Sequence, residues 1–200
     1  MILPIVAYGS PVLRKKAENI TPDYPGLKEL IADMYETMYE AHGVGLAAPQ
    51  IGKSIRLFVV DCAPFAEDDE VEGEVINEKN KALADFKKVF INPTLEEESG
   101  VEWGFTEGCL SIPDIREEVK RKPNLVISYV DENFQPRKLT LDGYAARVIQ
   151  HEYDHLEGVL FTDKINPMKR NLLRGKLNEI TKGRVDVRYK MKFPVTNKKR

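Results

Sequence analysis

The sequence predicts an α+β fold, with antiparallel or mixed sheets around a central helix that carries a His-Glu-x-x-His motif and with a further helix near the C-terminus. Three helical patterns are widely separated along the chain, and β-rich runs cluster before and around them. Strand and helix do not alternate as they do in a doubly wound fold. Because the chain has 200 residues, 42% of them hydrophobic, we expect one catalytic domain over residues 1–200.

The first half of the chain predicts one helix and two strands. The helix is expected over residues 26–41, where Gly43 offers a C-terminal stop and the apolar residues at helical spacing are Leu27, Leu30, Ile31, Met34 and Met38. Residues 55–60 and 88–92 are predicted as buried strands, and Pro93 marks where regular pairing falters. The acidic run at residues 67–74 has little to bury and is interpreted as a solvated excursion.

The second half predicts a hairpin followed by two helices. Residues 124–132 and 137–142 are β-rich and joined by a polar turn. Asp142 is then expected as the N-cap of a helix that Gly158 terminates. The last helix is predicted from about Pro167 to about Gly183, with an inner stripe of Met168, Leu172 and Ile180.

Cysteine content and hydropathy favour a cytoplasmic protein. Two cysteines, Cys62 and Cys109, provide no disulfide framework, which favours a reducing compartment. The N-terminal residues lack the features of a signal peptide. No stretch approaches the roughly 20 apolar residues that cross a bilayer, so we expect no membrane partner.

A metal site is predicted from two of the three histidines, His151 and His155. Their spacing of one helical turn places both imidazoles on the same face, where they can bind one cation. Glu152 beside them can accept a proton from metal-bound water, whose pKa falls toward about 7, and deliver it to a leaving amine. The motif therefore indicates metal-dependent amide hydrolysis. The remaining His42 precedes a glycine and is interpreted as a helix-terminus residue.

Two histidines leave a catalytic metal one protein ligand short of the usual three. A histidine six residues after His155 is excluded because that position is Phe161. Glu179 is an alternative ligand downstream. Cys109 is favoured, since its neighbouring glycine permits close backbone approach and polar residues flank the thiolate. Cys62 follows a predicted strand and is interpreted as a buried structural residue.

Three segments together resemble the signature motifs of the peptide deformylase family. They are Gly-Val-Gly-Leu-Ala-Ala-Pro-Gln at 43–50, Glu-Gly-Cys-Leu-Ser at 107–111 and Gln-His-Glu-Tyr-Asp-His at 150–155. Their order and separation make the resemblance specific, and it covers nearly the whole chain. It implies an enzyme that removes the N-formyl group from the initiator methionine of formylmethionyl peptides and nascent chains, releasing formate.

The resemblance also implies the roles of individual residues. In the family, one cysteine and both histidines bind the metal, which maps to Cys109, His151 and His155, with water as the fourth ligand. Fe²⁺ is the expected metal, although Zn²⁺, Co²⁺ or Ni²⁺ suit the same ligands. The side-chain amide of Gln50 and the backbone amide of Leu110 are expected to stabilise the charge that grows on the formyl oxygen.

Substrate binding is expected to combine main-chain contacts with an apolar pocket. The glycines at 43 and 45 allow a substrate backbone to lie close, and the resemblance places contacts at Val44, Gly45 and Gly108. The methionine pocket that it implies is lined by Val44, Phe105, Glu107, Tyr144, Val148 and the His151 ring. Arg147 stands where the family leads us to expect an apolar residue, and its long stem is expected to pack while its head stays in water.

Two other functions fit parts of the sequence. One is a zinc peptidase that uses His151, His155 and Glu179, and the other is an inactive module that binds N-termini, against which the intact Glu152 argues. Residues 168–200 carry twelve Lys or Arg against two acids, whereas residues 1–167 are net acidic. Some deformylases dock on the ribosome through a C-terminal helix, so this segment is the candidate here for contact with rRNA.

Overall fold

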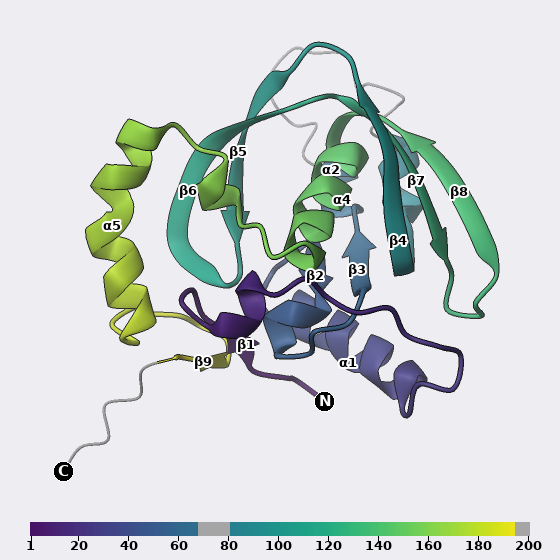
Figure 1. Cartoon of the computed structure of the whole chain (residues 1–200), viewed down its shortest axis with the longest axis horizontal. Coiled ribbons are helices and arrows are strands. Elements are labelled where there is room, and N and C mark those ends of the chain that lie inside the picture. The colour runs from purple at the N-terminus through teal and green to yellow at the C-terminus, as the bar shows by residue number, and fades with distance from the viewer. Residues whose placement is uncertain (68–80, 195–200) are drawn as a thin grey trace.

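The protein is described by a computed structural model that covers residues 1–67 and 81–194 (Figure 1). The acidic run predicted as a solvated excursion lies, apart from residue 67, outside the described residues. The helices are α1 (Leu27–Glu40), α2 (Pro64–Glu67), α4 (Gly143–Leu156) and α5 (Pro167–Thr181). Short 3₁₀ turns occupy Pro11–Arg14, Ala48–Ile51, Ala82–Asp85 and Phe161–Asp163.

Nine strands are seen in the described part of the chain. They are β1 (Ile5–Val6), β2 (Gly45–Ala47), β3 (Leu57–Asp61), β4 (Lys87–Ser99), β5 (Trp103–Cys109), β6 (Ile112–Arg121), β7 (Asn124–Val130), β8 (Pro136–Leu141) and β9 (Met191–Lys192). Five of them form an antiparallel sheet in the order β2-β3-β4-β7-β8. Strands β5 and β6 form a separate hairpin, and β1 pairs in parallel with β9. The observed architecture confirms the predicted α+β fold.

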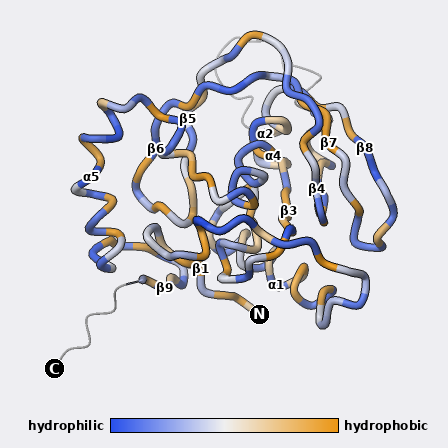
Figure 2. Tube along the Cα trace, in the orientation of Figure 1, coloured by the Kyte–Doolittle hydropathy of each residue, from blue (hydrophilic) through white to orange (hydrophobic). Residues whose placement is uncertain are grey.

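The five-stranded sheet has a helix on each face. Strand β3 is buried on both sides and alternates between two cores: Leu57 and Val59 pack with the residues of α1, whereas Phe58 and Val60 pack with those of α4. Hydrophobic colour accordingly runs along β3 in the middle of the molecule (Figure 2). The packing against the sheet therefore fixes the position of α4, the helix that carries the two histidines, relative to β2 and β3.

The β5–β6 hairpin packs against α5 and the N-terminal strand, as Figure 1 shows. Its inward side chains Ile112, Ile115 and Val119 join a third core with residues of α5, namely Leu177 and Ile180. The hairpin closes through the two residues that separate Cys109 from Ile112. This third core thus positions the tip of the hairpin, which carries Cys109, below the end of α4.

Most predicted elements are present, with shifted ends. Asp142 is the N-cap of α4, and Gly158 follows the helix with a φ of 73°, as predicted. Strand β4 does not end at Asn92 but continues to Ser99, and the expected fault at Pro93 takes the form of a register shift between Ile91 and Thr94. The left-handed residue after α1 is His42, with a φ of 54°, and not Gly43.

The predicted inner stripe of α5 is wrong at two of its three positions. Ile180 is buried, but Met168 and Leu172 are 75% and 80% exposed. The side chains that pack on the hairpin are Leu173, Leu177 and Ile180, a stripe about 100° around the helix from Leu172. Among the described residues, no helix combines the length and the apolar character needed to span a bilayer.

Candidate metal centre

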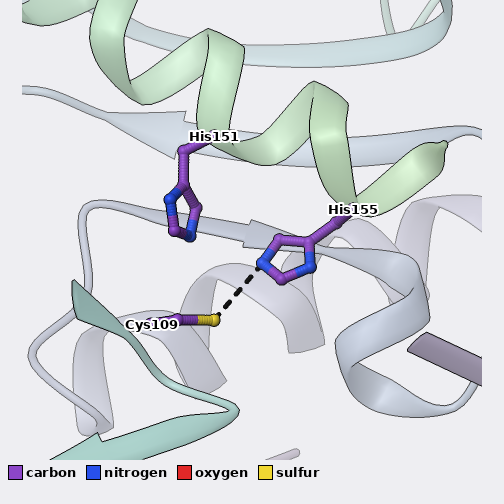
Figure 3. A group of neighbouring side chains, drawn as sticks. All are labelled: Cys109, His151 and His155. Carbon is purple, nitrogen blue, oxygen red and sulfur yellow. Dashed lines mark hydrogen bonds between the residues drawn. The ribbon is translucent and has the colours of Figure 1, made fainter. Parts of the chain in front are cut away.

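Cys109, His151 and His155 converge on one point between α4 and the tip of the β5–β6 hairpin. Their ligand atoms all lie within 4.8 Å of one another, and the Cys109 sulfur is 3.3 Å from Nε2 of His155. Figure 3 shows both imidazoles extending from α4 toward the sulfur. The structure therefore brings together the three residues that the sequence predicted, one from a strand and two from a helix, although Cys109 and His151 are more than 40 residues apart in the chain.

The chemistry of this donor set fits a divalent cation. One soft thiolate and two imidazoles are ligands that borderline transition metals prefer. Burial lowers the pKa of His155 well below its usual range, which keeps this imidazole neutral, as a metal ligand requires. Burial also lowers the pKa of His151, but hydrogen bonds with Cys109 and Glu107 outweigh it and raise this pKa well above its usual range. The site thus attracts positive charge between Cys109 and His151.

Glu107 orients the His151 imidazole by contacting the ring nitrogen that faces away from the Cys109 sulfur. Its Oε2 lies 3.0 Å from Nδ1 of His151, which leaves Nε2 of the ring to face the sulfur. A carboxylate that accepts from the outer nitrogen of a histidine fixes the tautomer and the ring plane of a metal ligand. Glu107 is only 5% exposed, and burial alone would raise its pKa. The net shift is strongly downward because Arg121 and His151 donate hydrogen bonds to the carboxylate.

Two arginines hold Glu107 in place. Arg121 donates to both carboxylate oxygens, at 2.7 and 2.9 Å, and also to Asp154 of α4 at 2.7 Å. Arg147 donates to Oε1 of Glu107 at 3.0 Å and to the carbonyls of Val119 and Trp103. The expectation that the head of Arg147 stays in water is wrong, since its side chain is 3% exposed. Its two terminal nitrogens donate to the carboxylate and the two carbonyls, whereas its Nε has no hydrogen-bond partner among the described residues. The guanidinium also lies over the Trp103 ring, 4.5 Å from the ring centre.

Glu152 lies buried beside the ligands, where β2 passes close to α4. A Cβ on Gly45 would come within 2.4 Å of Oε1 of Glu152, so only glycine lets the strand approach this carboxylate. The other oxygen, Oε2, has no hydrogen-bond partner among the described residues. A buried, unpartnered carboxylate oxygen favours a polar reactant at this position. Burial raises the pKa of Glu152 to about 7, although the nearby His151 acts in the opposite direction.

Gln50 and Leu110 flank the thiolate. The side-chain oxygen of Gln50 accepts from the amide of Ala47 at 2.8 Å, which turns Nε2 toward the Cys109 sulfur, 3.5 Å away, and toward Ser111. Leu110 is the first residue of the turn that follows Cys109. Gln50 is 1% exposed, so its amide is fixed by the fold before any substrate binds.

An aromatic group lies next to the site, on the side of α4 that faces the hairpin. The ring centres of Phe105 and Tyr144 are 5.5 Å apart. Phe65 stacks on Tyr144, and the Trp103 ring contacts both Phe105 and Tyr144 at a tilt. Val44 and Tyr144 pack with Val148 in the same core. Three of the residues expected to line an apolar pocket, Val44, Tyr144 and Val148, therefore share one core, and Phe105 joins them through its contact with Tyr144.

Two other predictions concern residues outside the site, and one residue of the site was not predicted. Glu179, the alternative ligand, lies on α5, pairs with Lys182 and Arg184, and does not belong to the ligand cluster. Cys62 is fully buried, as expected, and burial raises the pKa of its thiol to about 12, so it is inert. Arg121 was not predicted from the sequence, because nothing in the sequence shows that this charged residue is at a buried position of β6.

The fold and this site define a metal-dependent hydrolase. The family model described as polypeptide deformylase matches residues 2–171. The peptide deformylases of Christiangramia forsetii and Flavobacterium johnsoniae are each 56% identical over 200 residues and are covered, like this chain, over 100% of their length. The solved peptide deformylase of Thermotoga maritima superposes with a TM-score of 0.70 at 38% identity, covering 84% of this chain and 99% of that one. Arabidopsis thaliana peptide deformylase 1B, in complex with an inhibitor, gives a TM-score of 0.75 at 34% identity over 90% of each chain.

The chain belongs to the polypeptide deformylase family, whose metal-dependent members remove the N-formyl group from nascent polypeptides. This membership decides between the functions that the sequence left open. It excludes the peptidase that would use Glu179 as a ligand, and it excludes a module without hydrolytic activity.

Proposed function

We propose that deformylation by this chain uses Glu152 as general base and Cys109, His151 and His155 as the metal ligands. A divalent ion held by these residues would lower the pKa of water toward about 7 and would polarise the formyl oxygen. Glu152 accepts the proton that the attacking water loses and later donates it to the leaving amine. The observation that carries this proposal is the convergence of the three ligand atoms within 4.8 Å, next in the chain to the buried Glu152.

The oxyanion is stabilised by Nε2 of Gln50 and the backbone amide of Leu110. Negative charge grows on the formyl oxygen during attack, and donors that are already in place lower the barrier most. The position of Nε2, 3.5 Å from the Cys109 sulfur, supports this role, as does the fixed orientation that Ala47 gives to the amide. Both donors adjoin the Cys109 thiolate, so one formyl oxygen can accept from both.

The substrate backbone binds along β2, with contacts at Gly43, Val44, Gly45 and Gly108. Strand β2 is at the edge of the five-stranded sheet, so a peptide can add to it as a further strand. Recognition through main-chain atoms accommodates many residues after the methionine. The methionine side chain lies against Val44, Phe105, Tyr144 and Val148, while Glu107 closes the pocket through its hold on His151.

The native metal is Fe²⁺, and Zn²⁺, Ni²⁺ or Co²⁺ can replace it. The thiolate and two imidazoles support this choice of metals. Metal analysis after anaerobic purification tests it, with iron expected at one equivalent. The iron enzyme should also lose activity faster in air than under nitrogen, because the metal and the thiolate both oxidise. Equal half-lives in the two atmospheres would count against iron.

The general base is tested by formate release from an N-formylmethionyl tripeptide. Glu152→Gln keeps the size of the side chain but cannot accept the proton, so kcat should fall by roughly 10²–10⁴-fold with metal content unchanged. Glu157→Gln is the matched control, because Glu157 follows the same helix but pairs with Arg56 and Lys16. It should keep wild-type kcat. Substantial turnover by folded, metal-loaded Glu152→Gln overturns the assignment.

The enzyme works in the cytoplasm and docks on the ribosome through the basic segment 168–200. The exposure of Met168 and Leu172 on α5 supports this, since the outer face of the helix is free to contact a partner. Basic residues near this face would bind rRNA phosphates in a salt-dependent way. The rest of the chain is acidic, which favours one orientation of the enzyme on an RNA surface.

Ribosome co-sedimentation at low and high salt tests the docking. Arg174→Glu with Lys176→Glu reverses two exposed charges of α5 and should release the enzyme from ribosomes at low salt. Lys28→Glu with Lys53→Glu makes the same change in net charge on the N-terminal half and should leave binding intact. Binding that ignores salt, or that responds equally to both pairs, contradicts the proposal.

A further inference from the structure

The segment after α5 returns to the active site. The chain turns at Gly183, with a φ of 71°, and then runs back as β9 along β1. The amides of Ile5 and Ala7 donate to the carbonyls of Lys190 and Lys192, both at 2.9 Å. This return segment lies beyond residues 2–171, the part of the chain that the family model matches.

Tyr189 of this segment reaches the turn that follows the metal thiolate. Its hydroxyl donates to the carbonyl of Leu110 at 2.7 Å, and its half-buried ring packs on the α1 core together with the Leu110 side chain. The Leu110 side chain also lies against Gly43, where a Cβ would come within 2.8 Å of its Cδ1. The carbonyl of Leu110 is therefore fixed by the return segment through Tyr189, and its side chain is fixed by the segment after α1 through Gly43.

The next residue of the turn is held in the same manner. The carbonyl of Ser111 accepts from the amide of Tyr8 at 2.8 Å, and Tyr8 belongs to the N-terminal segment that pairs with β9. Only two residues join β5 to β6 here, and the pairing register shifts at Cys109. A short turn next to a register shift makes few hydrogen bonds between its own two strands. The hydrogen bonds from Tyr8 and Tyr189 therefore determine the orientation of the peptide groups in this turn.

We propose that Tyr189 is a positioning residue for deformylation, which fixes the Leu110 turn so that the Leu110 amide points at the reacting carbonyl. The inference rests on the proposed role of that amide as an oxyanion donor. A donor that is displaced or that rotates stabilises charge less in the transition state, and ground-state binding of the substrate changes little. The loss of Tyr189 should therefore lower kcat and leave KM almost unchanged.

The test compares Tyr189→Phe with Tyr24→Phe in the metal-loaded, full-length enzyme. Both changes remove one hydroxyl from a half-buried tyrosine of the α1 core, but Tyr24 is remote in the chain from the turn. Tyr189→Phe should lower kcat about tenfold, a partial loss of what one oxyanion donor supplies, with KM within about twofold. Metal content should match the wild type, and the melting temperature should fall by only about 2–4 °C, the effect of one lost hydrogen bond. Tyr24→Phe should keep wild-type kcat.

Amide hydrogen exchange of the zinc-loaded protein provides a readout that does not depend on turnover. Tyr189→Phe should speed exchange at Leu110 and Ser111 and leave the amides of β3 unchanged. Unchanged kcat and unchanged exchange at Leu110 overturn the inference, as does an equal fall of kcat in Tyr24→Phe. A wild-type enzyme that releases no formate would instead contradict the proposed function, and exchange at Leu110 would then still decide whether Tyr189 fixes the turn.

Discussion

Arg147 on α4 and Glu107 on β5 are joined by a 3.0 Å hydrogen bond inside the protein. Glu107 also contacts His151, and Arg147 also donates to the carbonyls of Val119 and Trp103. One guanidinium therefore couples the helix that carries two of the proposed metal ligands to the hairpin that carries the third. The relative position of the three proposed ligands therefore depends on a residue that is not one of them.

Arg147→Leu should destabilise the protein and loosen the metal. The change removes the guanidinium donors from the carbonyls of Val119 and Trp103 and one cation from the buried Glu107, which together should lower the free energy of unfolding by about 3 kcal/mol. Urea denaturation of the zinc-loaded protein and the rate of zinc transfer to a chelator measure the two effects. The control is Arg137→Leu, which breaks the exposed pair with Asp131 and should cost less than about 1 kcal/mol. Equal costs for the two variants would contradict the coupling.

Cys109→Ala should remove the metal without unfolding the sheet. The thiolate supplies one of three protein ligands, so metal affinity should fall by more than about 100-fold, beyond what the loss of a residue that only orients a ligand causes. Metal content after dialysis measures this, and circular dichroism checks the fold. Glu179→Gln is the control, since Glu179 is the alternative ligand and pairs only with surface cations of its own segment in the described structure. Retention of one equivalent of metal by Cys109→Ala would contradict the ligand set.

The sequence predicted the group formed by Cys109, His151 and His155, and the structure brings the three ligand atoms together. His151 and His155 need only a helix to share a face, and the helix is marked by Asp142 and Gly158 at its ends. The buried strand β3 was predicted as well, since continuous apolar residues fill both of its faces. Helices and strands whose sequence pattern lies within one segment were therefore predicted correctly.

What the sequence did not predict depends on contacts between distant segments. Strand β6 carries charged side chains on its outward face, and one inward position is Arg121, whose partner Glu107 lies on another strand. The same holds for Arg147, which is buried only because the β5–β6 hairpin supplies a carboxylate and two carbonyls. On α5, helical spacing alone did not show that the contacting stripe passes through Leu173 and not Leu172.

Gly45→Ala should impair catalysis while the metal stays bound. A methyl group at this position would lie within 2.4–2.8 Å of the Glu152 carboxylate and its Cγ, so the proposed general base has to move. A displacement of about 1 Å can cost about 100-fold in rate, and we expect a fall of kcat of this order. Gly175→Ala is the control, because nothing lies within 4 Å of a Cβ there and alanine favours the helix by about 1 kcal/mol. Wild-type kcat in Gly45→Ala would show that Glu152 does not need this close approach.

Asp163 should stabilise the protein at neutral pH and lose this effect in acid. Burial raises the pKa of this carboxyl, but hydrogen bonds from Arg14 and from the amide of Leu160 outweigh it and leave the pKa below its usual value. The folded state therefore binds the proton more weakly than the unfolded state does. The stabilisation by Asp163 is fully present at pH values above the pKa of the carboxyl in the unfolded state, which is about 4. It is lost as the pH falls through the lower pKa of the folded state.

Asp163→Asn measures this contribution. It removes the charge-assisted pairing with Arg14, which is partly exposed, so the free energy of unfolding should fall by only about 1 kcal/mol at pH 7. Urea denaturation of both proteins at pH 7 and pH 3 should show the difference shrinking at the lower pH, where metal release affects the two alike. Asp85→Asn, at an exposed carboxylate, should differ little from the wild type at either pH. A difference between Asp163→Asn and the wild type that stays constant or grows as the pH falls would mean that the ionised carboxylate of Asp163 is not what stabilises this contact.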